Sequence, residues 1–148
     1  MQKELPSYAC PVRGTSLSTI DAGVLVCAQG CKYPVGKGIA RFVPQDNYAA
    51  AFGLQWLEYP RTQLDSYSGV PVSRRRLQRC FGEEAWAQLQ GARVLEAGCG
   101  AGRFTEVLLQ QGASVESIDL SEAVLANAAN FPPGPRHRIA QADILALP

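Results

Sequence analysis

Residues 94–105 read Val94-Leu95-Glu96-Ala97-Gly98-Cys99-Gly100-Ala101-Gly102-Arg103-Phe104-Thr105, and residues 98–102 of this segment form a glycine stretch from which the fold class can be inferred. A short apolar strand runs into three glycines at alternate positions, and a helix follows. This order lets the main chain approach a nucleotide-like ligand, because a side chain at any of these glycines would block the approach or the tight turn. A glycine cluster alone is a weak signal, since an ordinary turn between a strand and a helix also uses glycine.

The alternation of strand and helix continues toward the C-terminus. Two helices and two more strands are expected, with helices over residues 104–111 and 121–129 and strands over residues 114–119 and 137–144. The sequence therefore predicts an α/β fold with a Rossmann-like parallel sheet, of which these are the first three strands, because parallel neighbours are joined by right-handed helical crossovers.

Three acidic side chains occupy equivalent places in this pattern. Glu96 lies on the first strand, Asp119 ends the second, and Asp143 lies near the end of the third. The carboxyl ends of parallel strands meet at one edge of the sheet, where such folds bind ligands, so we expect the three acids to face one crevice. Each acid alone is more simply a solvated loop carboxylate, but the three together favour a binding site.

The glycine spacing separates two classes of ligand. A dinucleotide fingerprint needs Gly or Ala where Arg103 stands, which disfavours a nicotinamide-dependent oxidoreductase. The pattern Glu-x-Gly-x-Gly-x-Gly over residues 96–102 resembles the first motif of class I S-adenosylmethionine-dependent methyltransferases. Residues 117–121 (Ser-Ile-Asp-Leu-Ser) and 141–148 (Gln-Ala-Asp-Ile-Leu-Ala-Leu-Pro) resemble the next two segments of that family, in the same order.

The resemblance implies a role for the glycine stretch. Main chain around Gly98, Gly100 and Gly102 would hold the amino-acid end of S-adenosylmethionine, and Glu96 would lie near its ammonium group. The reaction would be a direct displacement at the sulfonium methyl, which depends mainly on positioning. We expect Cys99 to be a packing residue and not a nucleophile.

For the nucleoside, the resemblance implies four further residues. Asp119 would accept hydrogen bonds from the ribose hydroxyls, and Leu120 would lie against the adenine face. Asp143 would accept from the exocyclic adenine amine, with the main chain of Ile144 along the same edge. An ionised carboxylate is only an acceptor and so suits a diol or an amine. No residue is singled out as a catalytic base, and His137 is expected to be a surface imidazole.

The N-terminal part carries a cysteine pattern. Cys10 stands before an expected hairpin, and Cys27 and Cys31 stand after it. Structural zinc takes four ligands, and Arg13 stands where a fourth is expected. Residues 10–44 resemble the zinc-ribbon heads of some bacterial methyltransferases, which makes the three cysteines candidate zinc ligands. Because of Arg13, we favour a degenerate ribbon held by packing over bound zinc.

Between these parts lies a helical stretch, so the expected units are residues 1–45, 46–91 and 92–148. Tyr48, Phe52, Trp56 and Tyr59 share one helix face, which is typical of a core and also allows a lid over a substrate. A second helix is expected to begin after Ser73 as its N-cap and to run to Leu89. The basic run of residues 74–76 with Arg79 is expected to be a solvated face, although a phosphate-bearing substrate could use it.

Composition limits the classes of function and of partner. The 148 residues include 14 Lys and Arg against 13 Asp and Glu, which gives no reason to expect nucleic acid or an anionic membrane surface as a partner. No apolar run reaches the roughly 20 residues of a membrane helix, and no secretory signal begins the sequence. Five cysteines, an odd number, favour a reducing compartment, which we expect to be the cytoplasm.

The resemblance also implies a seven-stranded sheet in which the first strand is central, whereas only three strands fit after Arg93. We therefore expect an uncovered edge on that strand, in the N-terminal part of a longer methyltransferase or a truncated product. The acceptor is expected to be a small molecule or glycan-like. The alternative is a non-catalytic module that binds the cofactor or a protein partner.

Overall fold

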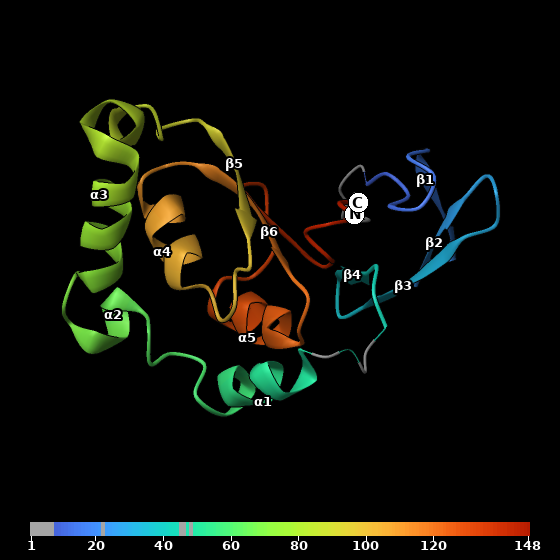
Figure 1. Cartoon of the computed structure of the whole chain (residues 1–148), viewed down its shortest axis with the longest axis horizontal. Coiled ribbons are helices and arrows are strands. Elements are labelled where there is room, and N and C mark those ends of the chain that lie inside the picture. The colour runs from blue at the N-terminus through green and yellow to red at the C-terminus, as the bar shows by residue number, and fades with distance from the viewer. Residues whose placement is uncertain (1–7, 22, 45–46, 48) are drawn as a thin grey trace.

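The computed structural model describes residues 8–21, 23–44, 47 and 49–148. Its seven strands form one sheet in the order β1-β2-β3-β4-β7-β6-β5. Figure 1 shows the antiparallel N-terminal strands at one end of the molecule and the helices gathered around its other end.

The parallel half follows the predicted β-α-β-α-β order. It consists of β5 (Arg93–Ala97), α4 (Arg103–Gln110), β6 (Ser114–Asp119), α5 (Ala123–Asn130) and β7 (His137–Gln141). Strand β6 pairs in parallel with β5 on one side and with β7 on the other. The prediction of a Rossmann-like parallel arrangement is confirmed, and the third strand is shorter than expected because it ends at Gln141.

Side chains alternate across these three strands, so each face of the sheet has its own partner. Val115 and Ile139 point to the face that α4 and α5 cover, and both lie in cores shared with those helices. Ile118 and Ala140 point to the opposite face and are buried against Phe42 and its neighbours from the N-terminal strands. The two halves of the chain therefore share one core across the sheet.

The N-terminal half is an antiparallel meander of β1 (Leu17–Asp21), β2 (Val24–Cys27), β3 (Lys32–Gly36) and β4 (Ile39–Arg41). Strand β4 then pairs in parallel with β7 through Ala40 and Ala140, which makes the sheet continuous across the whole chain. Beside this seam, Arg41 forms an ion pair of 3.2 Å with Glu122, just before α5. The division into three units stays a prediction, and the structure adds that the first unit continues the sheet of the third.

The helical stretch forms α1 (Ala50–Glu58), α2 (Asp65–Ser68) and α3 (Val72–Ala87). The prediction that Ser73 caps the second long helix is wrong. Its hydroxyl donates to Gln63 O (3.3 Å), and its N–H and that of Arg74 both donate to the carboxylate of Asp65 at 2.8 Å. Asp65, eight residues upstream, therefore satisfies the free N–H groups at the start of α3.

Strand β5 forms one border of the sheet. Among the described residues it pairs with β6 alone, and Leu95 is 52% exposed on the face of the sheet opposite α4. This agrees with the expectation of an uncovered apolar edge on the first parallel strand. In the described part of the chain, no helix combines the length and the apolar character needed to cross a membrane.

Candidate functional site

A cleft of about 420 Å³ opens at the carboxyl ends of β5 and β6. Parallel topology places it there, because the turns that leave these strands converge on one edge of the sheet. The residues that line it come from the glycine stretch, the end of β6 and the helical stretch: Ala49, Trp56, Gln63, Arg76, Gly98, Cys99, Gly100, Ala101, Arg103, Phe104, Asp119 and Ser121.

The glycine stretch forms one wall of this cleft. Gly98 and Gly100 have φ angles of 78° and 51°, in the left-handed region that favours glycine. The N–H groups of Gly98 and Cys99 donate to Ile118 O at 2.8 and 3.0 Å, which fixes the turn against β6. The main chain of this wall is therefore held against β6 and, without side chains at Gly98 and Gly100, can be approached closely.

Gly102 is needed for a different reason. Its φ is 101°, and a Cβ built on it would lie 2.7 Å from the ring of Phe131. It is absent from the residues that line the cleft. The structure thus explains this glycine by packing at the start of α4, and its expected contact with a cofactor stays a prediction.

Asp119 holds the site together. Its Oδ2 accepts from Gly100 N at 2.8 Å, and its Oδ1 accepts from the N–H and the hydroxyl of Ser121 at 2.8 and 2.7 Å. A carboxylate offers about four lone-pair positions, so these three bonds leave room for about one more donor. A ligand diol that used both of its hydroxyls would have to replace one of these partners.

Glu96 lies elsewhere than the sequence suggests. It is only 8% exposed, and its carboxylate accepts hydrogen bonds from the hydroxyls of Thr105 and Ser117. Burial raises the pKa of this carboxyl above its usual value, although the two hydroxyl donors oppose the shift. Because Glu96 faces the helix layer and does not line the cleft, this placement does not support a contact with the ammonium group of a ligand.

The hydrogen-bond network around Glu96 extends to the histidine. Ser117 Oγ lies 3.2 Å from His137 Nε2, and His137 Nδ1 lies 2.8 Å from Phe131 O. His137 is 4% exposed, so the prediction of a surface imidazole is wrong. Position 137 points to the same face of the sheet as Ile139, which α5 covers. Burial lowers the pKa of His137, so the neutral imidazole is favoured there.

The residues expected at the nucleoside lie at the right edge of the sheet but outside the cleft lining. The N–H of Ala142 donates to Asp119 O at 2.9 Å, which brings the start of the last segment beside Asp119. There the Asp143 carboxylate accepts from Leu145 N at 2.9 Å, and Ile144 is exposed. Leu120 O accepts from Asn47 and Gln141 side chains. The roles of Leu120, Asp143 and Ile144 stay predictions.

Sequence reasoning did not place the opposite wall of the cleft. Trp56 and Gln63 come from the helical stretch and Arg76 from α3, while Arg103 and Phe104 begin α4. The shared helix face of the four aromatic residues 48, 52, 56 and 59 and the basic run were the available signals. Each contributes one residue, Trp56 and Arg76 respectively. Tyr48 and the side chain of Phe52 lie outside the described part of the chain, and Tyr59 is largely exposed.

The arginines of the basic run lie in three different environments. Arg76 lines the cleft, whereas the Arg74 guanidinium lies 5.3 Å from the ring centroid of Trp86. Arg75 and Arg79 are exposed, as expected for a solvated helix face. The neighbouring Arg103 donates from Nε to Ser73 Oγ at 3.0 Å, which ties the start of α4 to α3. Two guanidinium groups thus contribute to one wall of the cleft.

Cys99 behaves as the packing residue that the sequence suggests. It is buried with Ile39, Val124 and Ile139. Burial raises the pKa of its thiol well above the usual value, so the reactive thiolate is disfavoured.

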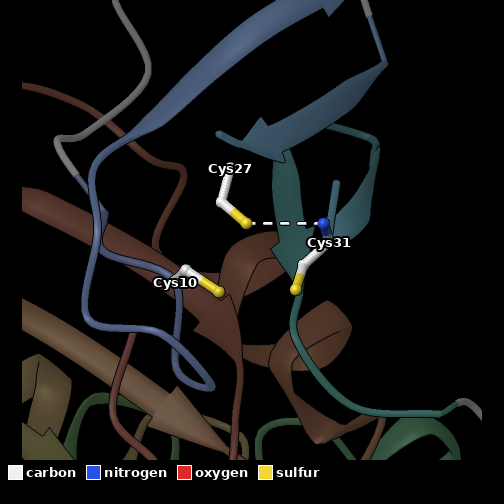
Figure 2. A group of neighbouring side chains, drawn as sticks. All are labelled: Cys10, Cys27 and Cys31. Carbon is white, nitrogen blue, oxygen red and sulfur yellow. Dashed lines mark hydrogen bonds between the residues drawn. The ribbon is translucent and has the colours of Figure 1, made fainter. Parts of the chain in front are cut away.

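A second group of chemistry-bearing side chains lies in the N-terminal half. The sulfur atoms of Cys10, Cys27 and Cys31 lie within 4.8 Å of one another. Figure 2 shows the three sulfurs turned toward a common space between two turns of the chain. The three candidate ligands named from the sequence are therefore brought together.

Comparison with known proteins now bears on the cleft. A family model described as a methyltransferase domain matches residues 94–148, which hold the glycine stretch, Asp119 and the last segment. These residues belong to the class I methyltransferase family. S-adenosylmethionine is the cofactor of that family, so both the family and the cofactor expected for this methyltransferase segment are confirmed.

Curated relatives match a part of this methyltransferase segment. Ubiquinone biosynthesis O-methyltransferase from Pseudomonas aeruginosa (strain LESB58) is 52% identical over 42 residues, which are 28% of this chain and 18% of the relative. The protein of that name from Bordetella avium is 49% identical over 43 residues, which are 29% of this chain and 18% of the relative. The match thus spans less than a fifth of the length of these relatives.

Two solved structures are also similar. A TehB-like SAM-dependent methyltransferase from Corynebacterium glutamicum is 25% identical, with a TM-score of 0.43 over 63% of this chain and 46% of that one. CalS10, an amino pentose methyltransferase from Micromonospora echinaspora, is 19% identical, with a TM-score of 0.36 over 68% of this chain and 38% of that one.

Proposed function

We propose that this chain binds S-adenosylmethionine in the cleft between the glycine stretch and α3, and that it serves methyl transfer to a small-molecule or glycan-like acceptor. One observation supports this most strongly. The carboxylate of Asp119, at the end of β6, is hydrogen-bonded to the main chain of Gly100, so a diol acceptor and a bare main-chain wall lie side by side. That pairing suits a ligand that carries a ribose and, beside it, a zwitterionic amino-acid group.

The two ends of the cofactor can be assigned within this proposal. Main chain at Gly98 and Gly100 lies against the amino-acid end, and Asp119 accepts from the ribose. Arg76 lines the wall opposite the glycine stretch, and a guanidinium is the best partner for the carboxylate of the methionyl group. We assign the contact with this carboxylate to Arg76. The contact with the ammonium group that Glu96 was expected to make is not part of the proposal. Leu120, Asp143 and Ile144 keep their expected places at the adenine.

The chemistry requires little from the side chains of this segment. The methyl group passes from the sulfonium to an acceptor atom in one displacement, so the protein must hold donor and acceptor in line. Trp56 and Phe104 line the cleft in which the donor would be held. The residues that contact the acceptor are not assigned on this chain. The names of the curated relatives and of CalS10 support a small-molecule acceptor.

Two further expectations stay part of the proposal. The nearly balanced charge gives no basis for a nucleic-acid or membrane partner, and the odd number of cysteines favours the cytoplasm.

Intrinsic fluorescence provides the first test, because the chain has two tryptophans and only Trp56 lines the cleft. S-adenosylmethionine should change the emission of the wild-type protein saturably, and Trp56→Phe should abolish the change. Trp86→Phe is the matched control and should keep it. NAD⁺ at the same concentrations should give no change. Preferential binding of NAD⁺, or no response to either ligand, would overturn the proposal.

Transfer is tested separately, with methyl-labelled S-adenosylmethionine and a set of phenolic and sugar acceptors. Label in an acceptor supports the enzyme. Saturable cofactor binding with no label transferred would favour the alternative, a non-catalytic module that binds the cofactor or a partner.

A further inference from the structure

The three cysteines of the N-terminal half come from two separate turns. Cys10 begins the turn that precedes β1, and Cys27 and Cys31 flank the turn between β2 and β3. Their sulfurs lie within 4.8 Å of one another. Zinc–thiolate bonds of about 2.3 Å in a tetrahedron place the sulfurs about 3.8 Å apart. Side-chain adjustments of under about an ångström would therefore bring all three onto one metal ion.

We propose that Cys10, Cys27 and Cys31 bind one Zn²⁺ ion through three thiolates, and that water completes its coordination in an open fourth position. This site is independent of the methyltransferase cleft. It differs from the four-ligand centre of a complete zinc ribbon, and it replaces the ribbon held by packing alone that Arg13 favours at the level of sequence, because the structure brings the three sulfurs together.

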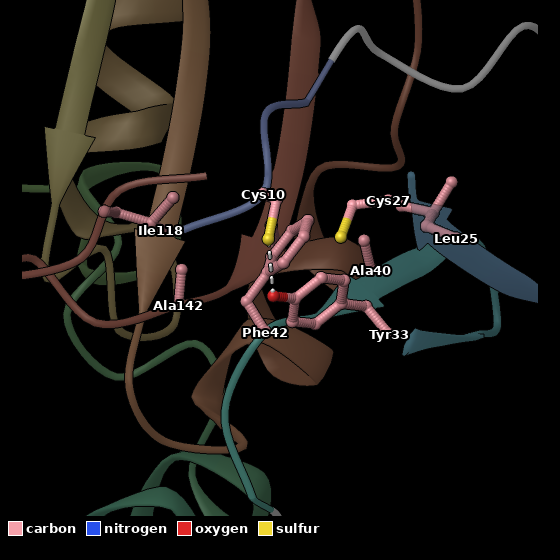
Figure 3. Packing of buried hydrophobic residues seen from close by; sticks show 9 residues of the cluster. Cys10, Leu25, Cys27, Tyr33, Ala40, Phe42, Ile118 and Ala142 are labelled. Atoms are coloured by element: carbon pink, nitrogen blue, oxygen red, sulfur yellow. Dashed lines mark hydrogen bonds between the residues drawn. The ribbon is translucent and has the colours of Figure 1, made fainter. Parts of the chain in front are cut away.

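Hydrogen-bonding groups lie beside two of the three sulfurs. The N–H of Cys31 donates to Cys27 Sγ at 3.4 Å. Tyr33 Oη lies 3.1 Å from Cys10 Sγ, and Figure 3 shows the hydroxyl directed at that sulfur. Donors of this kind stabilise thiolates and hold them in orientation, which is what a metal ion requires of its ligands.

Burial closes the site on one side only. Cys10 and Cys27 are almost fully buried beside Tyr33 and Phe42, in the core that joins the two halves of the chain. Cys31 is half-buried at the margin of that core. The metal would therefore be fixed from the core side, and its remaining position would face the margin at Cys31.

The composition of the chain leaves the fourth position open. The sequence has five cysteines and one histidine. Cys80 is exposed on α3, Cys99 is buried in a different core, and His137 is engaged with Ser117 and Phe131. No further thiolate or imidazole is available, Arg13 stands where the sequence pattern would place one, and no carboxylate of the described residues belongs to the group of three sulfurs. Three protein ligands and one water give an open, exchangeable zinc site.

The test begins with the wild-type protein, purified without chelator in the presence of a reductant. Elemental analysis should find one equivalent of zinc. Replacement by Co²⁺ should give the intense visible bands of tetrahedral cobalt together with thiolate charge transfer. Absence of metal after equilibration with Zn²⁺, or a disulfide among the three cysteines in its place, would overturn the proposal.

Variants locate the site. Cys27→Ser should lower zinc affinity at least 100-fold, and Cys80→Ser, the exposed control, should leave it unchanged. Because Cys27 is buried and its variant could fail to fold, the decisive variant is Arg13→Cys, at an exposed turn position. A fourth thiolate should raise zinc affinity at least tenfold in chelator competition and displace the water. Unchanged affinity in Arg13→Cys, or an equal loss in Cys80→Ser, would contradict a three-thiolate site.

Discussion

The parallel half and the cysteine half of this protein use similar parts in different ways. Both consist of short strands joined by tight turns, and both belong to one sheet. In the parallel half, Gly100 and Asp119 meet because strand ends converge whatever side chains the strands carry. In the cysteine half, three sulfurs meet because the turn before β1 and the turn after β2 lie at the same end of the β1–β2 hairpin. The parallel topology therefore places the first site, whereas the second site depends on which residues stand at a few turn positions.

The largest effect is expected where the two halves meet. Phe42 is buried, and its ring centroid lies 5.1 Å from that of Tyr8 and 5.0 Å from that of Tyr33. Phe42→Ala should lower the free energy of unfolding by about 3 kcal/mol, because it opens a cavity in the shared core. Phe81→Ala, at a partly exposed position on α3, should cost under about 1 kcal/mol.

Urea unfolding followed by circular dichroism and by tryptophan fluorescence measures both variants and also tests the comparison. The two tryptophans lie outside the cysteine half, so coincident midpoints in Phe42→Ala would show that the halves unfold together. A fluorescence midpoint that does not move would mean that the halves are independent.

A smaller loss is expected at the start of α4. Gly102→Ala combines a φ of 101° with a Cβ 2.7 Å from the Phe131 ring, and should lower the free energy of unfolding by about 2–3 kcal/mol. Gly91→Ala is matched to it, because φ is 78° and nothing lies within 4 Å of the added carbon. That variant should cost only about 1 kcal/mol, from backbone strain alone. Equal losses in the two variants would refute the packing explanation for Gly102.

The smallest effect is a change in pH dependence. Burial raises the folded-state pKa of Glu96 above its usual 4.5, so its contribution to stability is fully present below pH 4.5 and is lost as the pH rises through the folded-state pKa. Glu96→Gln keeps an oxygen that accepts from Thr105 and Ser117 but does not titrate. The stability of Glu96→Gln relative to wild type should therefore increase as the pH rises above 4.5.

Unfolding at a series of pH values from 4 to 8 measures that difference. The lowered pKa of His137 gives stability that is present above its usual 6.5 and is lost as the pH falls below it, but this contribution is common to both proteins. A difference that does not vary with pH would show that Glu96 titrates normally in the folded protein.

How far the sequence predicted this molecule also differs between the halves. The strand order, the positive φ angles of the glycines and the meeting of Gly100 with Asp119 follow from local pattern and parallel topology. The inward direction of Glu96 and the burial of His137 could not be predicted in this way, because they depend on which face of the sheet α4 and α5 cover. The capping of α3 by Asp65 is a tertiary contact across eight residues, and sequence rules for caps consider only adjacent positions.

The pairing of the two halves in one sheet is the feature that the sequence predicted least. Seven strands were expected from the family resemblance and three from the residues available after Arg93. The structure has seven, because β4 adds the N-terminal meander to the parallel strands through Ala40 and Ala140. No periodicity within either segment indicates that pairing, which joins residues 100 positions apart.

Calorimetric titration of S-adenosylmethionine into the wild-type protein and into Asp119→Ala shows whether the cofactor binds at the glycine stretch and Asp119. Removal of a charged acceptor from the ribose should weaken binding by at least about 1.5 kcal/mol, which is roughly a tenfold rise in Kd. Asp143→Ala, at the same edge but outside the cleft lining, should have a smaller effect. Equal affinity of wild type and Asp119→Ala, with both proteins folded, would contradict a cofactor site built on the glycine stretch and Asp119.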